Sequence, residues 1–450
     1  MMAPMTTSPI SPLDGRYAER TAPIADAMGD LALYRTRLQV EVSWLQVLSS
    51  MEGIPECPPI DLQTQDVLQH LVDNFGPQQL QQVLDIEKTT RHDVKAVEIY
   101  MRQHLDGTPW ANFVHFACTS EDINSVAMAS MLSKAVRQTW LAAARELADR
   151  LFDMADEYKS VPMLAHTHGQ PASPTTLGKE IGVYAYRLQR AMYAVNQHAL
   201  AAKWSGATGT FGAHVVAYPD IPWRQVARQF VESFGLEWTP ISTQIDSHDT
   251  MAELFHILIR ANQVVHDLCT DMWLYISMGY LDQRRVEAEV GSSTMPHKVN
   301  PIDFENAEAN IGLSNAVLGH LATKLTVSRL QRDLSDSSAI RNIGTALAHS
   351  YLALQSTITG LDRVVPDVAY LRQDLNRHWE VLTEAAQTVM RKHGHPDPYG
   401  YWKQRSRGTR MTQAEWLEAI RHLDIPKAEK AILADLTPDT YIGLAAQFNI

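Results

Sequence analysis

The chain has 450 residues, of which 45% are hydrophobic and 20% charged, a composition typical of a soluble protein with more than one domain. Its formal net charge of −12 argues against nucleic acid as a partner, although a local cluster of basic side chains can still bind a small anion. No segment approaches the roughly 18 consecutive apolar residues that a membrane-spanning helix needs. The N-terminus also lacks the pattern of a secretory signal, so we expect a cytoplasmic protein.

Cysteine and histidine spacing argues against a disulfide framework and against a metal site. The 3 cysteines are far apart and form no CxxC pair. Two histidine pairs, His166 with His168 and His393 with His395, have metal-ligand spacing, but neither has an obvious third and fourth ligand nearby. We therefore expect no metal and no cofactor.

The first two thirds of the chain predict helices with little strand. The N-terminal part, up to residue 110, predicts a small helical domain. Apolar residues recur at steps of three and four over residues 140–158, and residues 180–200 also have a helical pattern. The best strand signal is the run at 210–218, which predicts a short hairpin.

Proline placement predicts long helices in the later part of the chain. No proline lies between Pro240 and Pro296, or between Pro301 and Pro366. Within these stretches, residues 251–276 and 307–330 have helical periodicity. We therefore expect a mostly α-helical protein with domains at 1–110, 111–361 and 362–450. The last of these is a small helical domain.

Several predicted helices are apolar on more than one face, as in residues 311–325. Such a helix buries one face within its own chain and another against a neighbour. This pattern favours a helical core that is shared between subunits. A large monomeric bundle is the alternative.

The most informative run is GSSTMPHKVNP at residues 291–301. Its two prolines fix φ and remove backbone donors, which predicts a shaped loop. Ser292, Ser293, Lys298 and Asn300 place two hydroxyls, an ammonium and an amide on this loop, a set suited to holding a carboxylate and moving a proton. The alternative is a surface connector without chemistry.

This run resembles the signature of the fumarase/aspartase superfamily, whose members release fumarate from succinyl-bearing substrates. Five further blocks resemble the bacterial adenylosuccinate lyase family. They are SPLDGRY at 11–17, TTRHDVKAVE at 89–98, HFACTSEDIN at 115–124, THGQPASPTTLGKE at 167–180 and QRDLSDSSAIRN at 331–342.

The resemblance implies a fold, an assembly and a reaction. The implied fold is mostly α-helical and has three domains, with a long central helical bundle that forms the core of a homotetramer. Each active site would be shared between subunits. The implied reaction is β-elimination of fumarate from adenylosuccinate, giving AMP, and from the succinylated aminoimidazole carboxamide ribotide of purine synthesis. The family implies small nucleotide substrates and no cofactor.

Elimination needs a base for a weakly acidic C–H group and a donor set for the neighbouring carboxylate. The resemblance assigns the base to Ser292, with Ser293 as the competing assignment. Serine is a weak base, but Lys298 and backbone N–H groups can stabilise its alkoxide.

Elimination also needs an acid for the departing nitrogen. The resemblance assigns this role to His168 in THGQP, where Gly169 and Pro171 end any regular element. An imidazole can be tuned close to neutral pH. The resemblance pairs His168 with Glu305, which can equally be an acidic residue in the first turn of a helix. His166 is a less favoured candidate for the acid.

The remaining family positions predict contacts to substrate. Thr119 and Ser120 have the pattern of a helix N-cap, which is also an anion-binding position. Arg332, Ser337 and Arg341 offer forked donors and a hydroxyl for a phosphate. The contacts implied by the resemblance are Arg16, Tyr17, Arg91, His92, Asp93, Thr119, Ser120, Gln244, Ser293, Asn300, Asn306, Arg332, Ser337 and Arg341. Arg91 stands where Asn is also acceptable, which weakens the assignment for its side chain.

Three other functions remain open at this point. The nearest is another fumarate-releasing lyase, such as argininosuccinate lyase or fumarase, which needs no phosphate site. The second is a catalytically silent helical assembly protein, which has no chemical reason to keep Ser292, Lys298, His168 and Glu305 together. The third is a helical nucleic-acid-binding protein, which the acidic charge balance disfavours.

Overall fold

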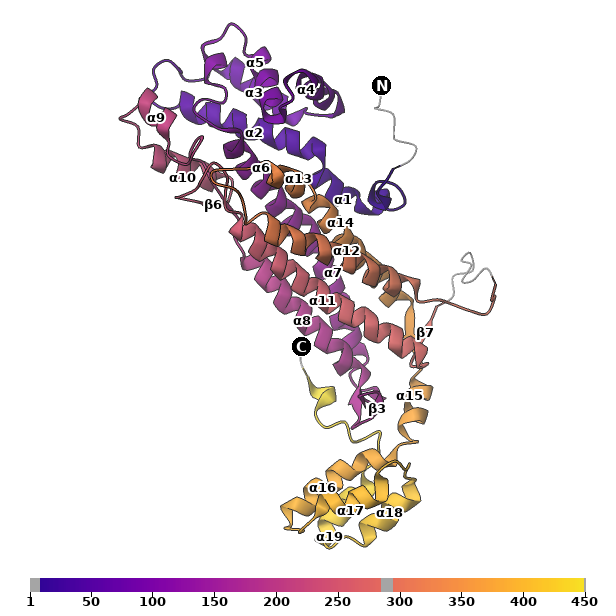
Figure 1. Cartoon of the computed structure of the whole chain (residues 1–450). Coiled ribbons are helices and arrows are strands. Elements are labelled where there is room, and N and C mark those ends of the chain that lie inside the picture. Colours follow the sequence, from indigo (N-terminus) through magenta and orange to yellow (C-terminus); the bar gives the residue numbers. More distant parts are fainter. Residues whose placement is uncertain (1–8, 285–293, 449–450) are drawn as a thin grey trace. The chain divides into compact units, whose positions relative to one another are not determined.

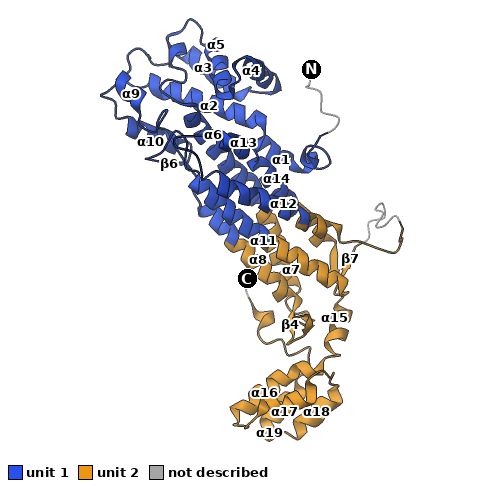
Figure 2. Ribbon diagram, viewed as in Figure 1, with its two compact units in different colours: residues 1–143, 191–263, 309–353 blue, residues 144–190, 264–308, 354–450 orange. Residues whose placement is uncertain are grey.

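The computed structural model describes residues 9–284 and 294–448, and it is mostly α-helical, as the sequence predicts (Figure 1). The chain forms two compact units, each built from three segments (Figure 2). Unit 1 comprises residues 1–143, 191–263 and 309–353, and unit 2 comprises residues 144–190, 264–308 and 354–450. The three-domain division at 110 and 361 is a different partition of the chain and stays a prediction.

Unit 1 contains the N-terminal helices together with short elements from two later segments. In its described part, β5 pairs with β6 in parallel, with Ala201 opposite Glu237. The elements are η1 (Pro12–Asp14), α1 (Ala18–Met28), α2 (Asp30–Ser49), α3 (Leu62–Asp73), α4 (Pro77–Thr90), α5 (Asp93–His104), η2 (Pro109–Phe113), α6 (Ser120–Lys134), the π-helical turn η3 (Ala135–Trp140), β5 (Ala201–Ala202), α9 (Gly212–Ala217), α10 (Trp223–Ser233), β6 (Glu237–Trp238) and α13 (Ser335–Ile340).

Among the described residues, five long helices have residues in both units. The helices predicted over 140–158, 180–200 and 251–276 are confirmed. The helix predicted over 307–330 is present, but it begins five residues earlier and ends at Lys324. The five are α7 (Leu141–Glu157), α8 (Leu177–Gln197), α11 (Asp249–Ser277), α12 (Ile302–Lys324) and α14 (Ile343–Arg363).

The periodic apolar residues of α11 explain why this helix forms. Met251, Phe255, Leu258 and Met272 recur on one side of it, and all four are buried. In an α-helix, spacings of three and four residues keep side chains on one face. The apolar stripe read from the sequence is therefore the core-facing side.

The hairpin predicted over 210–218 is wrong, because this segment forms helix α9. The N–H of Val215 donates to the carbonyl of Phe211 at 3.0 Å, and the N–H of Tyr218 donates to that of His214 at 2.9 Å. Valines favour a strand only where a neighbouring strand accepts their backbone bonds. Here Val216 is exposed, and the backbone is satisfied within one helical turn instead.

Unit 2 contains short antiparallel strand pairs and the C-terminal helices. Its pairs in the described residues are β1 with β4, β2 with β3, and β7 with β8. The elements are β1 (Pro162–Met163), β2 (His166–Thr167), β3 (Gln170–Pro171), β4 (Thr175–Thr176), β7 (Leu281–Gln283), β8 (Val364–Pro366), α15 (Val368–Leu375), η4 (Trp379–Leu382), α16 (Thr383–Lys392), α17 (Pro398–Ser406), α18 (Gln413–Arg421), α19 (Lys427–Asp435) and η5 (Ala445–Gln447).

The C-terminal helices of unit 2 share a hydrophobic cluster. Trp379, Leu382, Met390, Trp402 and Trp416 are all buried in it. Trp402 and Trp416 stack with their ring centroids 5.6 Å apart. This cluster holds four short helices that bury too little surface to be stable singly.

The described part of the GSSTMPHKVNP run, residues 294–301, is a loop, as the two prolines predict. Helix α12 begins at Ile302, directly after Pro301, and Glu305 lies in its first turn. Gly291, Ser292 and Ser293 lie outside the described residues. In the part of the chain that the structure describes, no helix is long and apolar enough to cross a membrane.

Candidate functional site

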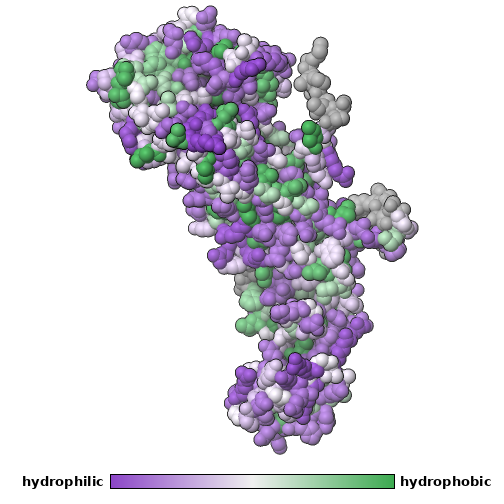
Figure 3. Space-filling model, viewed as in Figure 1, coloured by the Kyte–Doolittle hydropathy of each residue, from purple (hydrophilic) through white to green (hydrophobic). Residues whose placement is uncertain are grey.

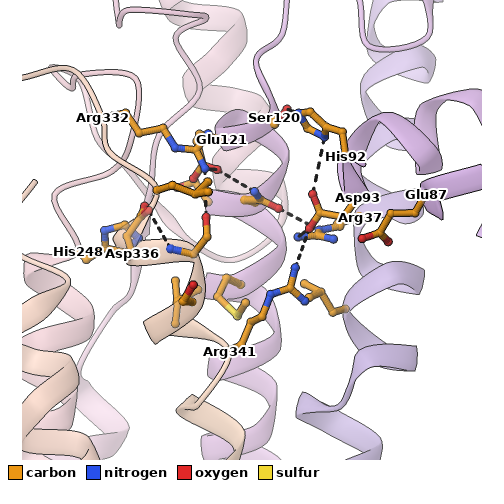
Figure 4. Close-up of a pocket in the computed structure, with 18 of the residues that line it drawn as sticks. Arg37, Glu87, His92, Asp93, Ser120, Glu121, His248, Arg332, Asp336 and Arg341 are labelled. Carbon is orange, nitrogen blue, oxygen red and sulfur yellow. Dashed lines mark hydrogen bonds and ion pairs between the residues drawn. The ribbon is translucent and has the colours of Figure 1, made fainter. Parts of the chain in front are cut away.

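A pocket of about 330 Å³ in unit 1 gathers many of the polar residues that the sequence singled out (Figure 4). Its walls come from α2, the junction of α4 and α5, the first turns of α6, and α13 with its flanking residues. Of the predicted contact residues, the pocket brings together Arg91, His92, Asp93, Ser120, Arg332, Ser337 and Arg341.

Two helices begin at the edge of this pocket. Arg91 ends α4 in the left-handed conformation, with φ of 52°, which lets α5 begin two residues later. His92 caps α5 by accepting the N–H of Lys95 at Nδ1, at 3.3 Å, and its Nε2 lies 3.3 Å from the Ser120 hydroxyl. Ser120 is itself the first residue of α6. Because helix N-termini attract anions, this wall suits a negatively charged ligand.

Asp93 joins two arginines on one side of the pocket. Its Oδ2 lies 2.8 Å from Nη2 of Arg37 and 2.7 Å from Nη2 of Arg341. Burial opposes ionisation of Asp93, but Arg37, the N–H of Val94 and Arg341 outweigh it and hold the pKa of this carboxyl below its ordinary value. Asp93 is therefore a fixed anion that aligns both guanidinium groups.

Glu121 organises the opposite side of the pocket. Its Oε1 lies 2.8 Å from Nη2 of Arg332 and accepts a 2.8 Å hydrogen bond from the amide of Asn124. Nη2 of Arg332 also donates to the Ser337 hydroxyl at 3.1 Å, and Nε of Arg37 donates to Oδ1 of Asn124 at 2.9 Å. These contacts make one continuous polar network from Arg341 to Ser337.

The pocket contains unpaired donors, although the formal charges of the side chains that line it sum to zero. Two arginine nitrogens, Nη1 of Arg37 and Nε of Arg332, are buried without a hydrogen-bond acceptor among the described residues. Such unpaired donors are costly and favour a ligand that brings acceptors or rearranges the network. The charged lining residues are Arg37, Arg91, Arg332 and Arg341 against Glu87, Asp93, Glu121 and Asp336.

A buried ion pair fixes the start of α6. Nζ of Lys203 lies 2.7 Å from Oδ1 of Asp122, and both side chains are fully buried. Asp122 also accepts the backbone N–H of Thr119 at 2.8 Å and that of Ser205 at 2.9 Å. Thr119 is thus the N-cap residue that the sequence predicts. It does not line the pocket, although Ser120 beside it does.

Sequence reasoning missed several residues that line the pocket. Arg37 lies on the buried face of α2, three and four residues after Tyr34 and Leu33, and is 3% exposed. A charged residue at helical spacing from apolar core positions was the signal that could have identified it. His248 is buried beside the pocket in a left-handed conformation, with φ of 59°. Non-glycine residues in this region are uncommon and concentrate at functional sites.

Other predicted contact residues in unit 1 lie away from this pocket. Arg16 is exposed, with its guanidinium carbon 5.8 Å from the ring centroid of Tyr17. Gln244 donates from Nε2 to the carbonyl of Ala207 at 2.9 Å. The roles of these residues in binding stay predictions.

In unit 2, His168 lies at the exposed tip of the hairpin formed by β2 and β3. It has φ of 55°, and the following Gly169 has φ of 70°. This two-residue turn matches the expectation that Gly169 and Pro171 would end any regular element. The imidazole is therefore carried on a projecting turn.

The other predicted catalytic residues of unit 2 lie at the start of α12 and before it. Lys298 is exposed on the loop, and Asn300 is half-buried. Oε1 of Glu305 accepts a hydrogen bond from the Trp273 indole at 3.2 Å, and Oδ1 of Asn306 accepts one from Ser356 at 2.8 Å.

Two predictions about catalysis are not tested by these contacts. Ser292 and Ser293 lie outside the described residues. Within the described part of one chain, no hydrogen bond or ion pair joins His168 to Glu305, so their pairing stays a prediction. No group of three or more His, Cys, Asp or Glu side chains among the described residues is arranged to hold a metal ion.

Sequence comparisons identify relatives over the whole chain. A family model described as lyase matches residues 15–319, and one described as adenylosuccinate lyase C-terminal matches residues 328–442. The adenylosuccinate lyase of Haemophilus influenzae is 44% identical, over 98% of each chain. That of Escherichia coli strain K12 is 43% identical, over 97% of this chain and 96% of the relative.

Solved structures of the same fold are more distant in sequence. A fumarate lyase from Mesorhizobium sp. BNC1 superposes with a TM-score of 0.75 at 15% identity, over 95% of this chain and 96% of that one. A 3-carboxy-cis,cis-muconate lactonizing enzyme from Pseudomonas putida gives 0.74 at 18% identity, over 97% of each chain. At such identities these two structures establish the fold alone. The two family models and the adenylosuccinate lyases that match nearly the whole chain show that it belongs to the adenylosuccinate lyase family of the fumarase/aspartase superfamily.

Proposed function

We propose that the protein cleaves adenylosuccinate into AMP and fumarate. By the same β-elimination it cleaves the succinylated aminoimidazole carboxamide ribotide of purine synthesis. The observation that carries this proposal is the unit 1 pocket, where Arg332, Ser337 and Arg341 gather beside two helix N-termini. Relatives that span the whole chain and bear the name adenylosuccinate lyase support the same reaction.

The pocket suits the phosphate end of a nucleotide. Arg332 and Arg341 offer forked donors, and the Ser337 hydroxyl lies within 3.1 Å of Arg332. Asp93 and Glu121 hold these guanidinium groups in place before substrate arrives, which lowers the entropy cost of binding. Arg91 and His92, which line the pocket, approach the base. Arg16 and Tyr17, which lie outside it, contact the phosphate and ribose by resemblance to the family.

Chemistry begins with removal of the proton beside a succinyl carboxylate. Ser292 takes this proton, and Lys298 stabilises the negative charge that builds on the carboxylate. Asn300 and Gln244 hold the same succinyl group, together with the hydroxyls of Thr119 and Ser120. Ser293 and Asn306 complete the contacts. The C–N bond then breaks, its electron pair passes to nitrogen, and the new C=C bond gives fumarate.

His168 protonates the departing nitrogen. Its place on an exposed turn suits a group that must reach into a site, and an imidazole can exchange a proton near neutral pH. Glu305 of another subunit would bond the second ring nitrogen and fix the tautomer. No metal or other cofactor takes part in this scheme.

The protein functions as a homotetramer in the cytoplasm, with each active site shared between subunits. Exposed apolar side chains on the long helices support this assembly. On the face seen in Figure 3, hydrophobic patches interrupt the hydrophilic surface. The exposed apolar side chains include Val183, Tyr186 and Tyr193 on α8, Trp273 and Leu274 on α11, and Leu313 on α12. The partners are small nucleotide substrates rather than nucleic acid or membrane.

Turnover of adenylosuccinate by the purified protein tests this function, with AMP and fumarate measured together. The parent protein should release the two products in equal amounts, and Ser292→Ala should abolish turnover. Ser293→Ala, on the same loop, tests the competing assignment of the base. If Ser293→Ala loses turnover and Ser292→Ala retains it, Ser293 rather than Ser292 is the base.

A parent protein that leaves adenylosuccinate intact contradicts the proposed function. Argininosuccinate and malate are then the substrates to test, because related lyases act on them without a phosphate site. Absence of turnover with all three would favour the silent assembly protein.

A further inference from the structure

The hairpin that carries His168 is too short to hold its own shape. Strands β2 and β3 have two residues each, with Thr167 opposite Gln170. The turn places His168 in the left-handed conformation, with φ of 55°, which is strained for a non-glycine residue. An isolated two-stranded hairpin is marginal in water even when it is longer. The pairing of β1 with β4 continues the hairpin, with Met163 opposite Thr175, and contacts from other segments of unit 2 hold both of its flanks.

The N-terminal flank is held by the C-terminal helices of the same unit. Leu164 lies two residues before β2 and is 1% exposed. It is buried in the cluster formed by residues such as Leu382 and Met390. The N–H of Ala172 then donates to the carbonyl of Ala165 at 2.8 Å and closes the base of the hairpin.

The C-terminal flank is held by Glu384, in the first turn of α16. The Ser173 hydroxyl, two residues after β3, donates a hydrogen bond to Oε2 of Glu384. The hydroxyl of Tyr441, from the C-terminal segment, donates to the same oxygen at 3.0 Å. Burial and then the nearby Glu384 raise the pKa of Tyr441 to about 12, so its hydroxyl keeps the proton it donates at neutral pH. One carboxylate thus joins three segments of unit 2.

We propose that Glu384 is a positioning residue for His168, which fixes the hairpin through Ser173. The proposal rests on the role of His168 as the general acid in the proposed function. Bonds to an ionised acceptor are stronger and more directional than neutral ones. Glu384 therefore restricts the hairpin more than a neutral side chain in its place could.

Three variants test this contact. Glu384→Ala removes the acceptor, and Glu384→Gln keeps an oxygen acceptor without the charge. Ser173→Ala removes only a hydroxyl from a half-buried residue and should leave folding intact. Arg391→Ala, at an exposed position on the same helix, is the matched control.

Hydrogen exchange and kinetics are measured on the same full-length proteins. In Glu384→Ala, amide exchange over residues 164–173 should be several-fold faster. The kcat for adenylosuccinate should fall about fivefold, because losing an exposed charged hydrogen bond changes an equilibrium by a factor of about five. KM should stay within about twofold of the parent value. Glu384→Gln should recover part of kcat. Ser173→Ala added to Glu384→Ala should cause no further loss, because both act through one contact.

Unchanged exchange over residues 164–173 in Glu384→Ala overturns the proposal. Faster exchange with an unchanged kcat also overturns the proposal, because catalysis would then not depend on a fixed hairpin. If the parent protein has no lyase activity, the proposed function fails by itself. In that case exchange still decides whether Glu384 holds the hairpin.

Discussion

Units 1 and 2 carry their candidate functional residues in opposite ways. In unit 1, three arginines of the pocket, Arg37, Arg332 and Arg341, are held in a network with Asp93 and Glu121 as its anions. In unit 2, His168 projects from a hairpin tip and Lys298 lies on an exposed loop. One unit thus has a formed pocket, whereas the other presents its reactive groups on the surface.

This difference separates binding from chemistry. A pocket whose side chains are fixed before the ligand arrives can bind a phosphate at low entropic cost. The proposed general acid lies on an exposed turn and has to be completed by groups from elsewhere, because catalysis depends on desolvated and oriented partners. Variants in unit 1 should therefore affect affinity, and variants in unit 2 should affect the rate of the chemical step.

The largest effect is expected from His168→Ala in unit 2. Loss of a general acid typically lowers kcat by about 10²–10⁴-fold. KM should change little, because the nucleotide pocket of unit 1 is untouched. Steady-state kinetics with adenylosuccinate measure both constants, and His166→Ala is the control on the same hairpin. A large rise in KM with unchanged kcat would contradict the separation of roles.

A stability effect of similar size is expected from Lys203→Met in unit 1. This change leaves Asp122 buried without its cation, which typically costs about 3–5 kcal/mol. Thermal unfolding followed by circular dichroism measures the loss. Hydrogen exchange should be faster at the start of α6 but unchanged over residues 164–173 of unit 2. Restored stability in the double variant Lys203→Met/Asp122→Leu would show that the unpaired carboxylate is the cause.

Arg332→Ala should weaken binding of AMP by about 10- to 100-fold, as expected for the loss of a charge-assisted contact. Titration calorimetry measures this affinity directly. Arg332→Lys keeps the charge near Glu121 but loses the fork, so it should recover only part of the affinity. Arg329→Ala, on the exposed side of the same segment, should bind AMP as the parent does. Equal affinity in parent and Arg332→Ala would remove this residue from the phosphate contact.

The smallest effect concerns pH and His214, which lies among aromatic rings in unit 1. Burial lowers the pKa of His214 from its ordinary value of 6.5 to about 4. Between these two pH values the unfolded chain therefore binds a proton that the folded protein does not. The neutral state of His214 stabilises the fold above about pH 6.5, and this contribution is lost as pH falls towards 4, by on the order of 2 kcal/mol. Unfolding midpoints measured from pH 7 to pH 4.5 should fall less in His214→Phe than in the parent. Parallel curves would contradict this assignment.

The sequence predicted those elements whose pattern depends on local spacing. Helix α11 has apolar residues at regular steps, and its buried face follows directly from them. The segment at 210–218 was predicted as a hairpin because its valines favour strands. The segment is helical because the helix buries His214 and because, in the described part of the chain, no strand pairs with it.

The candidate site shows the same limit. Arg332, Ser337 and Arg341 stand close together in sequence, so a phosphate contact could be predicted. Arg37 and His248 reach the pocket from positions far away in the chain, and only the folded structure brings them there. The anchoring of the His168 hairpin by Glu384 joins residues 211 apart in sequence, which no local pattern predicts.

The most direct test of shared sites is a mixture of two impaired variants, one deficient in binding and the other in the chemical step. Arg332→Ala and His168→Ala are combined under conditions that allow subunits to exchange, and adenylosuccinate turnover is measured at a substrate concentration well below the parent KM, where each variant alone has little activity. If the pocket of one chain works with the hairpin of another, an equal mixture should recover about a quarter of the parent activity. A mixture of Arg332→Ala with Arg341→Ala should recover none, because both lie in the pocket of one chain. Absence of recovery in the first mixture would contradict the account, since it would mean that each chain completes its own site.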